Sequence, residues 1–188
     1  MARLYGLTGK KRVGKDTAGQ ALVECGYVRA AFADALKMML ATFLSIRGAS
    51  DQEIAAMIEG QLKEAPTDYL FGATPRHAMQ TLGTEWGRNC INQDLWVLTL
   101  KEAIEAALAQ GASVVVTDVR FNNEAKVIRD LGGTVVHLTR PNYVTIDLHA
   151  SEAGVLFLPG DVNLENRYHT AAEFKNMVKY TLGAPAHE

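Results

Sequence analysis

Residues 9–15, with the sequence GKKRVGK, constrain the fold of this chain more than any other feature. They match the pattern G-x-x-x-x-G-K, in which a glycine-containing loop joins a strand to a helix and wraps a phosphate with its backbone N–H groups. The apolar run at 4–8 predicts the strand, and residues 16–25 place apolar side chains at helical spacing. The sequence therefore predicts an α/β fold with a phosphate site at its first strand-to-helix turn.

Each part of this loop has a chemical role. Gly9 and Gly14 permit backbone angles that other residues avoid, the helix N-terminus supplies partial positive charge, and Lys15 brings a full positive charge to the phosphates. The pattern usually has Ser or Thr directly after the lysine as a magnesium ligand, whereas this chain has Asp16 there and Thr17 behind it. Either Thr17 takes the metal role one position late, or Asp16 acts directly or through water.

A second carboxylate is expected at the end of a neighbouring buried strand, where it would position magnesium. The valine run at 114–116 leads through Thr117 to Asp118, and Arg120 lies two residues further on. The alternative is that Asp118 caps the next helix.

Strand-like and helix-like segments alternate along the chain, which predicts a mostly parallel sheet covered by helices. Strands are expected at 4–8, 27–33, 113–117, 134–139 and 161–166. Helices are expected at 16–25, 34–45 (capped by Asp34), 51–59, 94–110 and 123–131, with two more that begin at 75 and 171. With 188 residues and no repeat or linker, we expect a single domain over 1–188.

Composition excludes several classes of protein. Lys and Arg number 19 against 21 Asp and Glu, which gives a formal net charge of −2 and argues against a nucleic-acid binder. The 2 cysteines include no C-x-x-C pair, so neither a disulfide framework nor a zinc cluster is expected. No apolar stretch is long enough for a membrane span or a signal peptide, and we expect a cytoplasmic protein.

Two features of the sequence distinguish between classes of phosphate-loop protein. A regulatory GTPase would need an Asn-Lys-x-Asp motif to read guanine, and this sequence contains none. A small chain with a cationic lid predicts a small-molecule kinase, in which Arg and Lys offset the charge of the transferring phosphoryl group.

Four sequence blocks point to one family of such kinases. They are 9–17, which ends in GKDT; 76–85 (RHAMQTLGTE) with 94–97 (DLWV); 118–124 (DVRFNNE) with 133–141; and 149–154 (HASEAG) with 161–166 (DVNLEN). In composition and order they resemble the deoxynucleoside monophosphate kinases of tailed bacteriophages. The resemblance covers well over half of the chain.

The resemblance implies a three-layer P-loop kinase sandwich with a central parallel sheet, helices on both faces, an acceptor-binding region at about 34–96 and a lid at about 140–160. It implies transfer of the ATP γ-phosphate to a deoxynucleoside 5′-monophosphate, with Mg²⁺, which gives the diphosphate and ADP. The expected partners are small-molecule nucleotides, with no nucleic acid and no membrane, and a homodimer is an open option. A phage-encoded enzyme would work in the host cytoplasm.

The resemblance also implies site residues, together with the patterns above. Lys15, Arg12, Asp118 and Arg120 are expected in catalysis. Gly9, Arg12, Val13, Gly14, Lys15, Asp16, Thr17, Arg140 and Asn166 are expected to bind ATP. Lys11, Lys37, Arg76, Gly83, Thr84, Trp96 and Glu124 are expected at the acceptor. Asp16, Thr17 and Asp118 are the expected metal ligands.

Several of these residues have a structural alternative. Trp96 could stack on a base or belong to the core, and Lys37 could contact a phosphate or be solvated. Asn166 could touch the adenine or cap a turn, and Arg140 could clamp a phosphate or be a surface charge. Arg76 lies in the first turn of a helix, where a cation is unfavourable unless something anionic is near.

Two alternative functions remain open at this point. One is another small-molecule kinase of the same architecture, such as a dephospho-coenzyme-A kinase, and the other is a non-catalytic nucleotide-binding module. The segment between Lys37 and Arg76 is much shorter than in the larger phage enzymes. Because this segment shapes the nucleobase pocket, the base preference is not carried over.

Overall fold

A computed structural model describes residues 2–141 and 154–183 of the 188-residue chain. The chain divides into two compact units. Unit 1 consists of Met1–Phe32 and Leu100–Glu188, and unit 2 is Ala33–Thr99.

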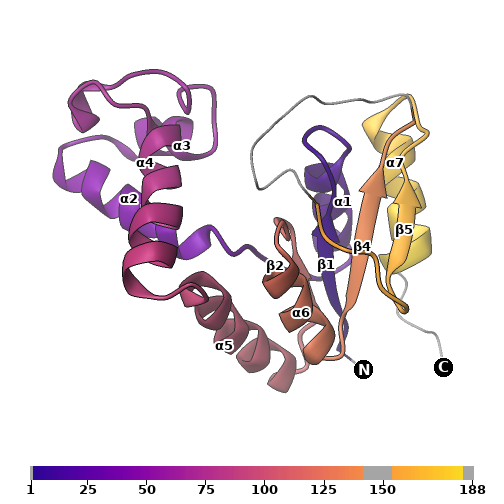
Figure 1. Cartoon of the computed structure of the whole chain (residues 1–188). Helices are drawn as coiled ribbons and strands as arrows, with labels where there is room; N and C mark the ends of the chain where they lie inside the picture. The colour runs from indigo at the N-terminus through magenta and orange to yellow at the C-terminus, as the bar shows by residue number, and fades with distance from the viewer. Residues whose placement is uncertain (1, 142–153, 184–188) are drawn as a thin grey trace. The chain divides into compact units, whose positions relative to one another are not determined.

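Unit 1 is built on a parallel sheet (Figure 1). In the described part of the chain the strands are β1 (Leu4–Thr8), β2 (Val28–Ala30), β3 (Val114–Val116), β4 (Thr134–Thr139) and β5 (Val162–Glu165). Their order is β2-β3-β1-β4-β5, so the first strand of the chain is the central one. Every pair is parallel, with Leu4 opposite Val114 and Tyr5 opposite Thr134. The predicted fold class is confirmed.

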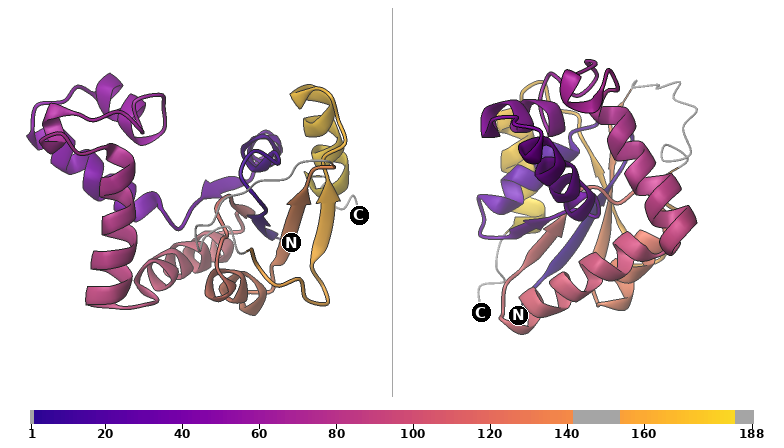
Figure 2. Two further views of the ribbon diagram at one scale, coloured as in Figure 1. Left: turned by 45° about the horizontal axis from the view of Figure 1, so that its top comes forward. Right: turned by 90° about the vertical axis from the view of Figure 1, so that its left-hand side faces the viewer.

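Helices cover both faces of this sheet (Figures 1 and 2). On one face, α1 (Lys15–Val23) and α7 (Ala171–Val178) share a core with the strands, in which Leu22 and Phe174 are fully buried. On the other face lies α6 (Asn122–Asp130), and its Ile128 side chain approaches β1 so closely that Gly6 has no room for a Cβ atom. The three valines of β3 are buried, as expected of an interior parallel strand.

Several element boundaries in the first part of the chain differ from the sequence prediction. The helix expected at 16–25 is α1, Lys15–Val23, and the helix expected at 34–45 is α2, which ends at Ile46. The strand expected at 27–33 is only Val28–Ala30, because β2 is an edge strand with β3 as its single neighbour. Asp34 is the first residue of α2 rather than its cap, and Ala33 occupies the cap position. The carboxylate of Asp34 still lies in the first turn, where its negative charge interacts favourably with the helix dipole.

Unit 2 is helical. It contains α2 (Asp34–Ile46), α3 (Asp51–Ile58), a 3₁₀ turn η1 (Asp68–Leu70), α4 (Pro75–Thr81) and a π-helical segment η2 (Leu82–Ile91). The helix α5 (Leu95–Ala109) begins in this unit and continues into unit 1. Leu36, Leu40 and Leu44 recur every four residues along α2 and form the core together with Met57 of α3.

Local capping signals fix where several helices begin. Thr74 accepts a hydrogen bond from the His77 N–H (3.1 Å) at the start of α4, as the Thr-Pro pair predicts. Thr170 and Glu173 form the predicted capping box of α7, which the π-helical segment η4 (Lys179–Gly183) extends. Among the described residues, no helix is both long and apolar enough to cross a membrane.

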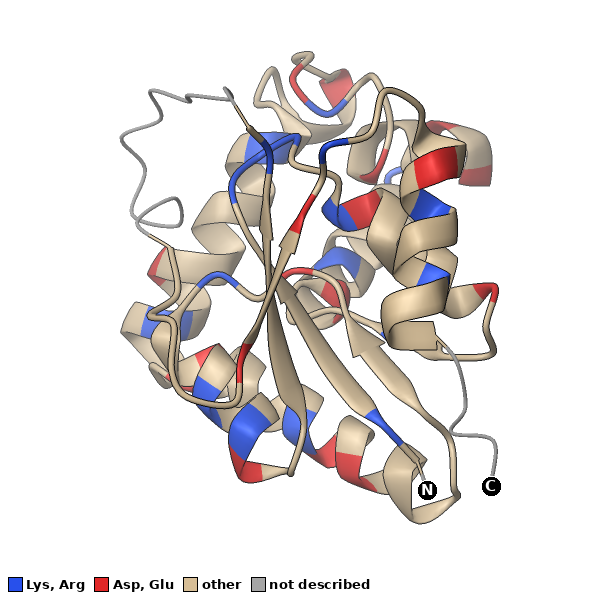
Figure 3. Cartoon of the chain, turned by 90° about the vertical axis from the view of Figure 1, so that its right-hand side faces the viewer, with Lys and Arg blue, Asp and Glu red and all other residues tan. Residues whose placement is uncertain are grey.

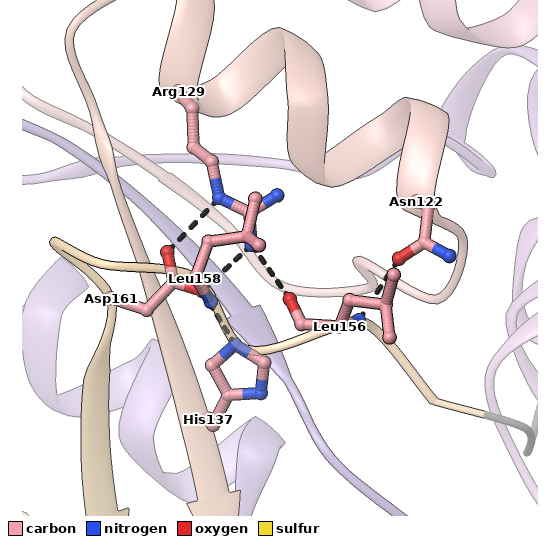
Figure 4. Close-up of polar contacts among 6 residues, drawn as sticks. All are labelled: Asn122, Arg129, His137, Leu156, Leu158 and Asp161. Carbon is pink, nitrogen blue, oxygen red and sulfur yellow. Dashed lines mark hydrogen bonds and ion pairs between the residues drawn. The ribbon is translucent and has the colours of Figure 1, made fainter.

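Most of the expected lid, residues 142–153, lies outside the described residues. The part that follows it is fastened to unit 1 by Asp161 (Figure 4). The Asp161 carboxylate accepts hydrogen bonds from Nε and Nη2 of Arg129 in α6 (3.0 and 2.7 Å) and lies 3.0 Å from Nε2 of His137 in β4. Arg129 also donates to the Leu156 carbonyl (3.0 Å), and the Leu156 N–H donates to Asn122 (2.9 Å).

The Asp161 side chain is only 2% exposed, so its charge depends on these partners. Burial acts to raise the pKa of Asp161, but hydrogen bonds from Arg129, the Leu158 N–H and His137 outweigh it and lower that pKa from 3.8 to about 2. The carboxylate therefore stays ionised and holds the entry into β5 against α6 and β4.

Candidate active site

The loop between β1 and α1 has a backbone that only glycine permits at two places. Gly9 has a φ of 139°, and a Cβ atom there would lie 2.4 Å from the Leu138 carbonyl oxygen of β4. Gly14 has a φ of 111°, and its Cβ would lie 2.8 Å from the Phe174 ring. Arg12 also lies in the left-handed region, with a φ of 65°. The loop is thus tightly curved and packed against β4 and α7.

Lys15 lies where this loop becomes α1. Its ammonium group donates to the carbonyl oxygens of Gly9 (2.5 Å) and Lys10 (2.7 Å), so it bridges the two ends of the loop. The cap position of α1 is Gly14, and no side chain in the described structure caps this helix N-terminus. The first N–H groups of a helix have no partner within the helix. Together they offer a phosphate a ring of backbone donors and a nearby cation.

The remaining loop residues differ in exposure. Lys10, Lys11, Arg12 and Asp16 are exposed, whereas Val13 is buried. The buried Val13 side chain anchors the loop in the core of unit 1. Figure 3 shows acidic and basic residues interleaved along the helices beside the sheet.

Asp118 follows β3, which is parallel to its neighbour β1. Asp118 and the loop after β1 therefore lie at the same end of the sheet, the carboxyl ends of the strands. One carboxylate oxygen accepts a hydrogen bond from the Phe32 N–H (2.8 Å), which joins Asp118 to the chain just after β2. The helix α6 has Phe121 at its cap position, so the alternative in which Asp118 caps this helix is wrong.

Glu124 supports the turn that carries Arg120. The Glu124 carboxylate is buried and accepts hydrogen bonds from the backbone N–H groups of Arg120 (2.8 Å) and Phe121 (3.1 Å). Arg120 itself is exposed. A contact between Glu124 and an acceptor stays a prediction.

Arg140 and Asn166 follow two neighbouring strands, β4 and β5. Arg140 is exposed. Asn166 is 7% exposed, accepts a hydrogen bond from the Tyr168 N–H (3.3 Å) and donates to the Val13 carbonyl (3.1 Å). Of the two alternatives for Asn166, the structure shows the capped turn, and contact with adenine stays a prediction.

In unit 2, the two cations predicted at the acceptor each have a carboxylate partner. Lys37 of α2 lies 2.6 Å from Glu59, and Arg76 of α4 lies 2.7 Å from Glu64. The anion that the position of Arg76 calls for is therefore present in the chain itself. Sequence reasoning missed both glutamates, because neither lies at helical spacing from its partner.

Trp96 takes the core position of its two alternatives. It is 5% exposed, and its indole N–H donates to the Gly83 carbonyl (2.8 Å). Gly87 lies against the same ring, where a Cβ would come within 2.5 Å. The neighbouring Trp86, which sequence reasoning passed over, is 41% exposed. Contacts of Gly83 and the exposed Thr84 with an acceptor stay predictions.

The expected metal ligands are side chains with oxygen donors. In residues 2–141 and 154–183, no group of three or more His, Cys, Asp or Glu side chains is arranged to hold a metal ion. Asp16, Thr17 and Asp118 supply hard oxygen donors, which suit Mg²⁺, and Mg²⁺ beside phosphates usually needs only one or two protein ligands. The residues fit the ion, and its site stays a prediction.

Comparison with known proteins gives one family. The model of the family described as deoxynucleotide monophosphate kinase matches residues 72–177. A protein of Acanthamoeba polyphaga mimivirus, provisionally named deoxynucleotide monophosphate kinase, is 32% identical over 186 residues, and the match covers 93% of each chain. The deoxynucleotide monophosphate kinase of Enterobacteria phage T4 is 32% identical over 92 residues, which make up 48% of this chain and 38% of the phage protein.

One solved structure bears on the fold. The dephospho-CoA kinase from Campylobacter jejuni aligns with a TM-score of 0.51 at 12% identity, over 97% of this chain and 96% of that chain. At this identity the likeness concerns the fold, and it agrees with the parallel sheet of unit 1.

Proposed function

This chain belongs to the deoxynucleotide monophosphate kinase family and is a kinase, and we propose that it transfers the γ-phosphate of ATP to a deoxynucleoside 5′-monophosphate. The products are ADP and the deoxynucleoside diphosphate. The acceptor oxygen forms the new bond to phosphorus, the bond to the bridging oxygen of ATP breaks, and that oxygen leaves on ADP.

The observation that carries the proposal is the loop of residues 9–15. Glycines shape it, Lys15 bridges it, and it leads into a helix N-terminus without a side-chain cap. Such a loop provides backbone donors and positive charge for a polyphosphate, which is what transfer between two bound substrates requires of the protein.

The roles of individual residues follow from where their charges lie along the chain. Lys15, Arg12, Arg120 and Arg140 stabilise the charge that develops on the transferring group. Lys37 and Arg76 of unit 2 hold the acceptor phosphate, and Arg76 can do so with two parallel hydrogen bonds. Asp16, Thr17 and Asp118 would hold Mg²⁺, which neutralises phosphate charge when bound.

We place the enzyme in the cytoplasm, where its nucleotide substrates are found. ATP and Mg²⁺ are its proposed cosubstrate and metal.

A coupled assay of ADP release tests the proposal. The purified chain is given Mg·ATP and, in separate reactions, each deoxy- and ribonucleoside monophosphate and dephospho-coenzyme A. We expect at least one deoxynucleoside monophosphate to raise ADP release well above the rate with ATP alone. Stimulation by dephospho-coenzyme A only would assign a different kinase activity. No stimulation by any acceptor, together with tight ATP binding, would indicate a binding module.

A further inference from the structure

Asn166 joins the end of β5 to the phosphate loop, although the two lie far apart in sequence. Its backbone N–H donates to the Thr139 carbonyl (2.8 Å), which continues the β4–β5 pairing one residue past β5. Its side-chain amide then reaches across to the Val13 carbonyl in the loop (3.1 Å). This contact is buried, so water does not compete for the Val13 carbonyl.

Both ends of the Asn166 amide are used, and this fixes its orientation. The side-chain oxygen accepts a hydrogen bond from the Tyr168 N–H (3.3 Å), so the nitrogen must face Val13. The backbone of Asn166 is held in the sheet at the same time. The donor that meets the loop is therefore rigid.

A fixed Val13 carbonyl also fixes the next N–H group of the loop. The Val13–Gly14 peptide is trans and planar, so its C=O and N–H bonds point in opposite directions. When Asn166 holds the carbonyl, the Gly14 N–H is turned to the side away from Asn166. Peptide rotation at this point would be easy without such a hold, because glycine has few conformational restrictions.

The space around Gly14 gives independent support. A Cβ atom on Gly14 would lie 2.9 Å from the Asn166 side-chain nitrogen and 2.8 Å from the Phe174 ring. The loop backbone is therefore packed against both side chains. Phe174 is itself buried and has Tyr168 beside it, with ring centroids 6.3 Å apart.

We propose that Asn166 is a positioning residue of the phosphate loop: through the Val13 carbonyl it sets the direction of the Gly14 N–H, and so the grip of the loop on the ATP phosphates. Asn166 then acts through the loop and makes no contact with the base. This inference rests on the proposed function only in that the loop binds ATP.

The test measures the affinity of the full chain for two probes, Mg·ATP and Mg·tripolyphosphate, by titration calorimetry. Tripolyphosphate shares the phosphates of ATP and has no base. Asn166→Ala removes the donor, and Asn166→Asp places an acceptor opposite the Val13 carbonyl. We expect each variant to lose affinity for both probes by the same factor, about tenfold or more. The loss should be larger for Asn166→Asp than for Asn166→Ala.

A matched control is Asn163→Asp. Asn163 is an exposed residue of β5, the strand that directly precedes Asn166, so the change adds the same charge as Asn166→Asp at a position away from the loop. We expect its affinities to equal those of the wild type. In kinetics, Asn166→Ala should raise the KM for ATP and leave the KM for the acceptor unchanged, which a general loss of structure would not do.

Three outcomes are decisive. If Asn166→Ala weakens ATP but not tripolyphosphate, Asn166 reads the base and the inference is wrong. If the wild type binds both probes and the variants bind them equally well, the hydrogen bond to Val13 is irrelevant to the loop. If the wild type binds neither probe, the proposed function fails first. Should Asn166→Ala not fold, Asn166→Ser replaces it, with the same equal loss expected for both probes.

Discussion

The two regions predicted to hold phosphate present their positive charge in different ways. In the loop of unit 1, the Lys15 ammonium group donates hydrogen bonds to two carbonyl oxygens. In unit 2, Lys37 forms an ion pair with the Glu59 carboxylate, and Arg76 forms one with the Glu64 carboxylate. The Lys15 ammonium group is thus held by backbone oxygens of the loop, whereas a phosphate that approaches Lys37 or Arg76 competes with a carboxylate.

Backbone carbonyls hold the cation of the predicted phosphate loop, and side-chain carboxylates hold the cations of the predicted acceptor region. Exposed ion pairs in water are weak, about 0–1 kcal/mol each, so exchange of the glutamates for a phosphate is feasible. The buried pair of Arg129 and Asp161 is a third case, in which charge serves the fold alone. Four changes can break or sharpen this comparison.

The largest effect is expected at Lys15. Lys15→Ala removes the ammonium group that lies where the loop becomes α1 and should lower kcat/KM for phosphoryl transfer by about 10³-fold, because the charge of the transition state loses a direct partner. Steady-state kinetics measures the loss, and circular dichroism should show an unchanged fold. Lys10→Ala, an exposed lysine of the same loop, is the control and should cost far less. Turnover close to wild type in Lys15→Ala would refute the assignment of the loop.

Asp161→Asn should affect stability rather than chemistry. It leaves Arg129 beside a neutral amide in a buried site and should lower the free energy of unfolding by about 2–3 kcal/mol. The control Asp130→Asn breaks the exposed pair of Lys126 and Asp130 on the same helix and should cost about 0.5 kcal/mol or less. Urea unfolding measures both. Equal effects would show that burial does not distinguish the two pairs.

The pKa of Asp161 also predicts how stability depends on pH. Its folded value of about 2 lies below the ordinary 3.8, so between these values the folded protein binds fewer protons at Asp161 than the unfolded chain does. The contribution, about 2 kcal/mol, is complete above pH 4 and is lost as the pH falls toward 2. Asp161→Asn should flatten this part of the acid unfolding curve, and an unchanged curve would contradict the assignment.

An intermediate effect is expected at Arg76. Arg76→Ala should raise the KM for the acceptor by roughly 10–100-fold and leave the KM for ATP unchanged, since a charged hydrogen bond to phosphate is lost. Arg76→Lys should recover part of the loss because it keeps the charge. Arg47, which lies over the Phe71 ring in the same unit, gives the control Arg47→Ala. A rise in both KM values would place Arg76 outside the acceptor site.

The smallest effect is expected at Glu59. Glu59→Gln frees Lys37 from its competing anion and should lower the acceptor KM about twofold to threefold, within the range of an exposed ion pair. The control Glu105→Gln breaks the pair of Glu105 and Lys101, which has the same 2.6 Å separation. Kinetics under matched salt would detect the difference. A higher acceptor KM would mean that Glu59 orients Lys37 rather than competing for it.

Much of the fold could be predicted because its signals are local. The strands Leu4–Thr8 and Thr134–Thr139 have the predicted bounds, since each is a short apolar run that ends at a turn. The caps at Thr74 and Thr170 follow from residues within one turn of the helix. The short β2 was not predicted, because its length depends on its place at the sheet edge.

The candidate site was less predictable, because its contacts are long-range. The sequence marks the loop, yet it cannot show that Asn166 donates to Val13, since 153 positions separate them. Lys37 and Glu59 lie 22 positions apart, which no helical or strand spacing connects. Trp96 has an aromatic ring that could stack on a base, and its packing against Gly87 in the folded chain shows that it belongs to the core. Which cation has which partner is a property of the folded chain.

The central position of β1 has a consequence for how the chain folds. Leu4 pairs with Val114 and Tyr5 with Thr134, so neither edge of β1 can be covered until more than half of the chain is available. Large loops must close before these contacts form, which slows folding and exposes strand edges meanwhile. Unit 2 lies entirely within the loop between β1 and β3. A longer unit 2 would make this loop longer and so slow the assembly of the sheet, whatever unit 2 contributes to substrate binding.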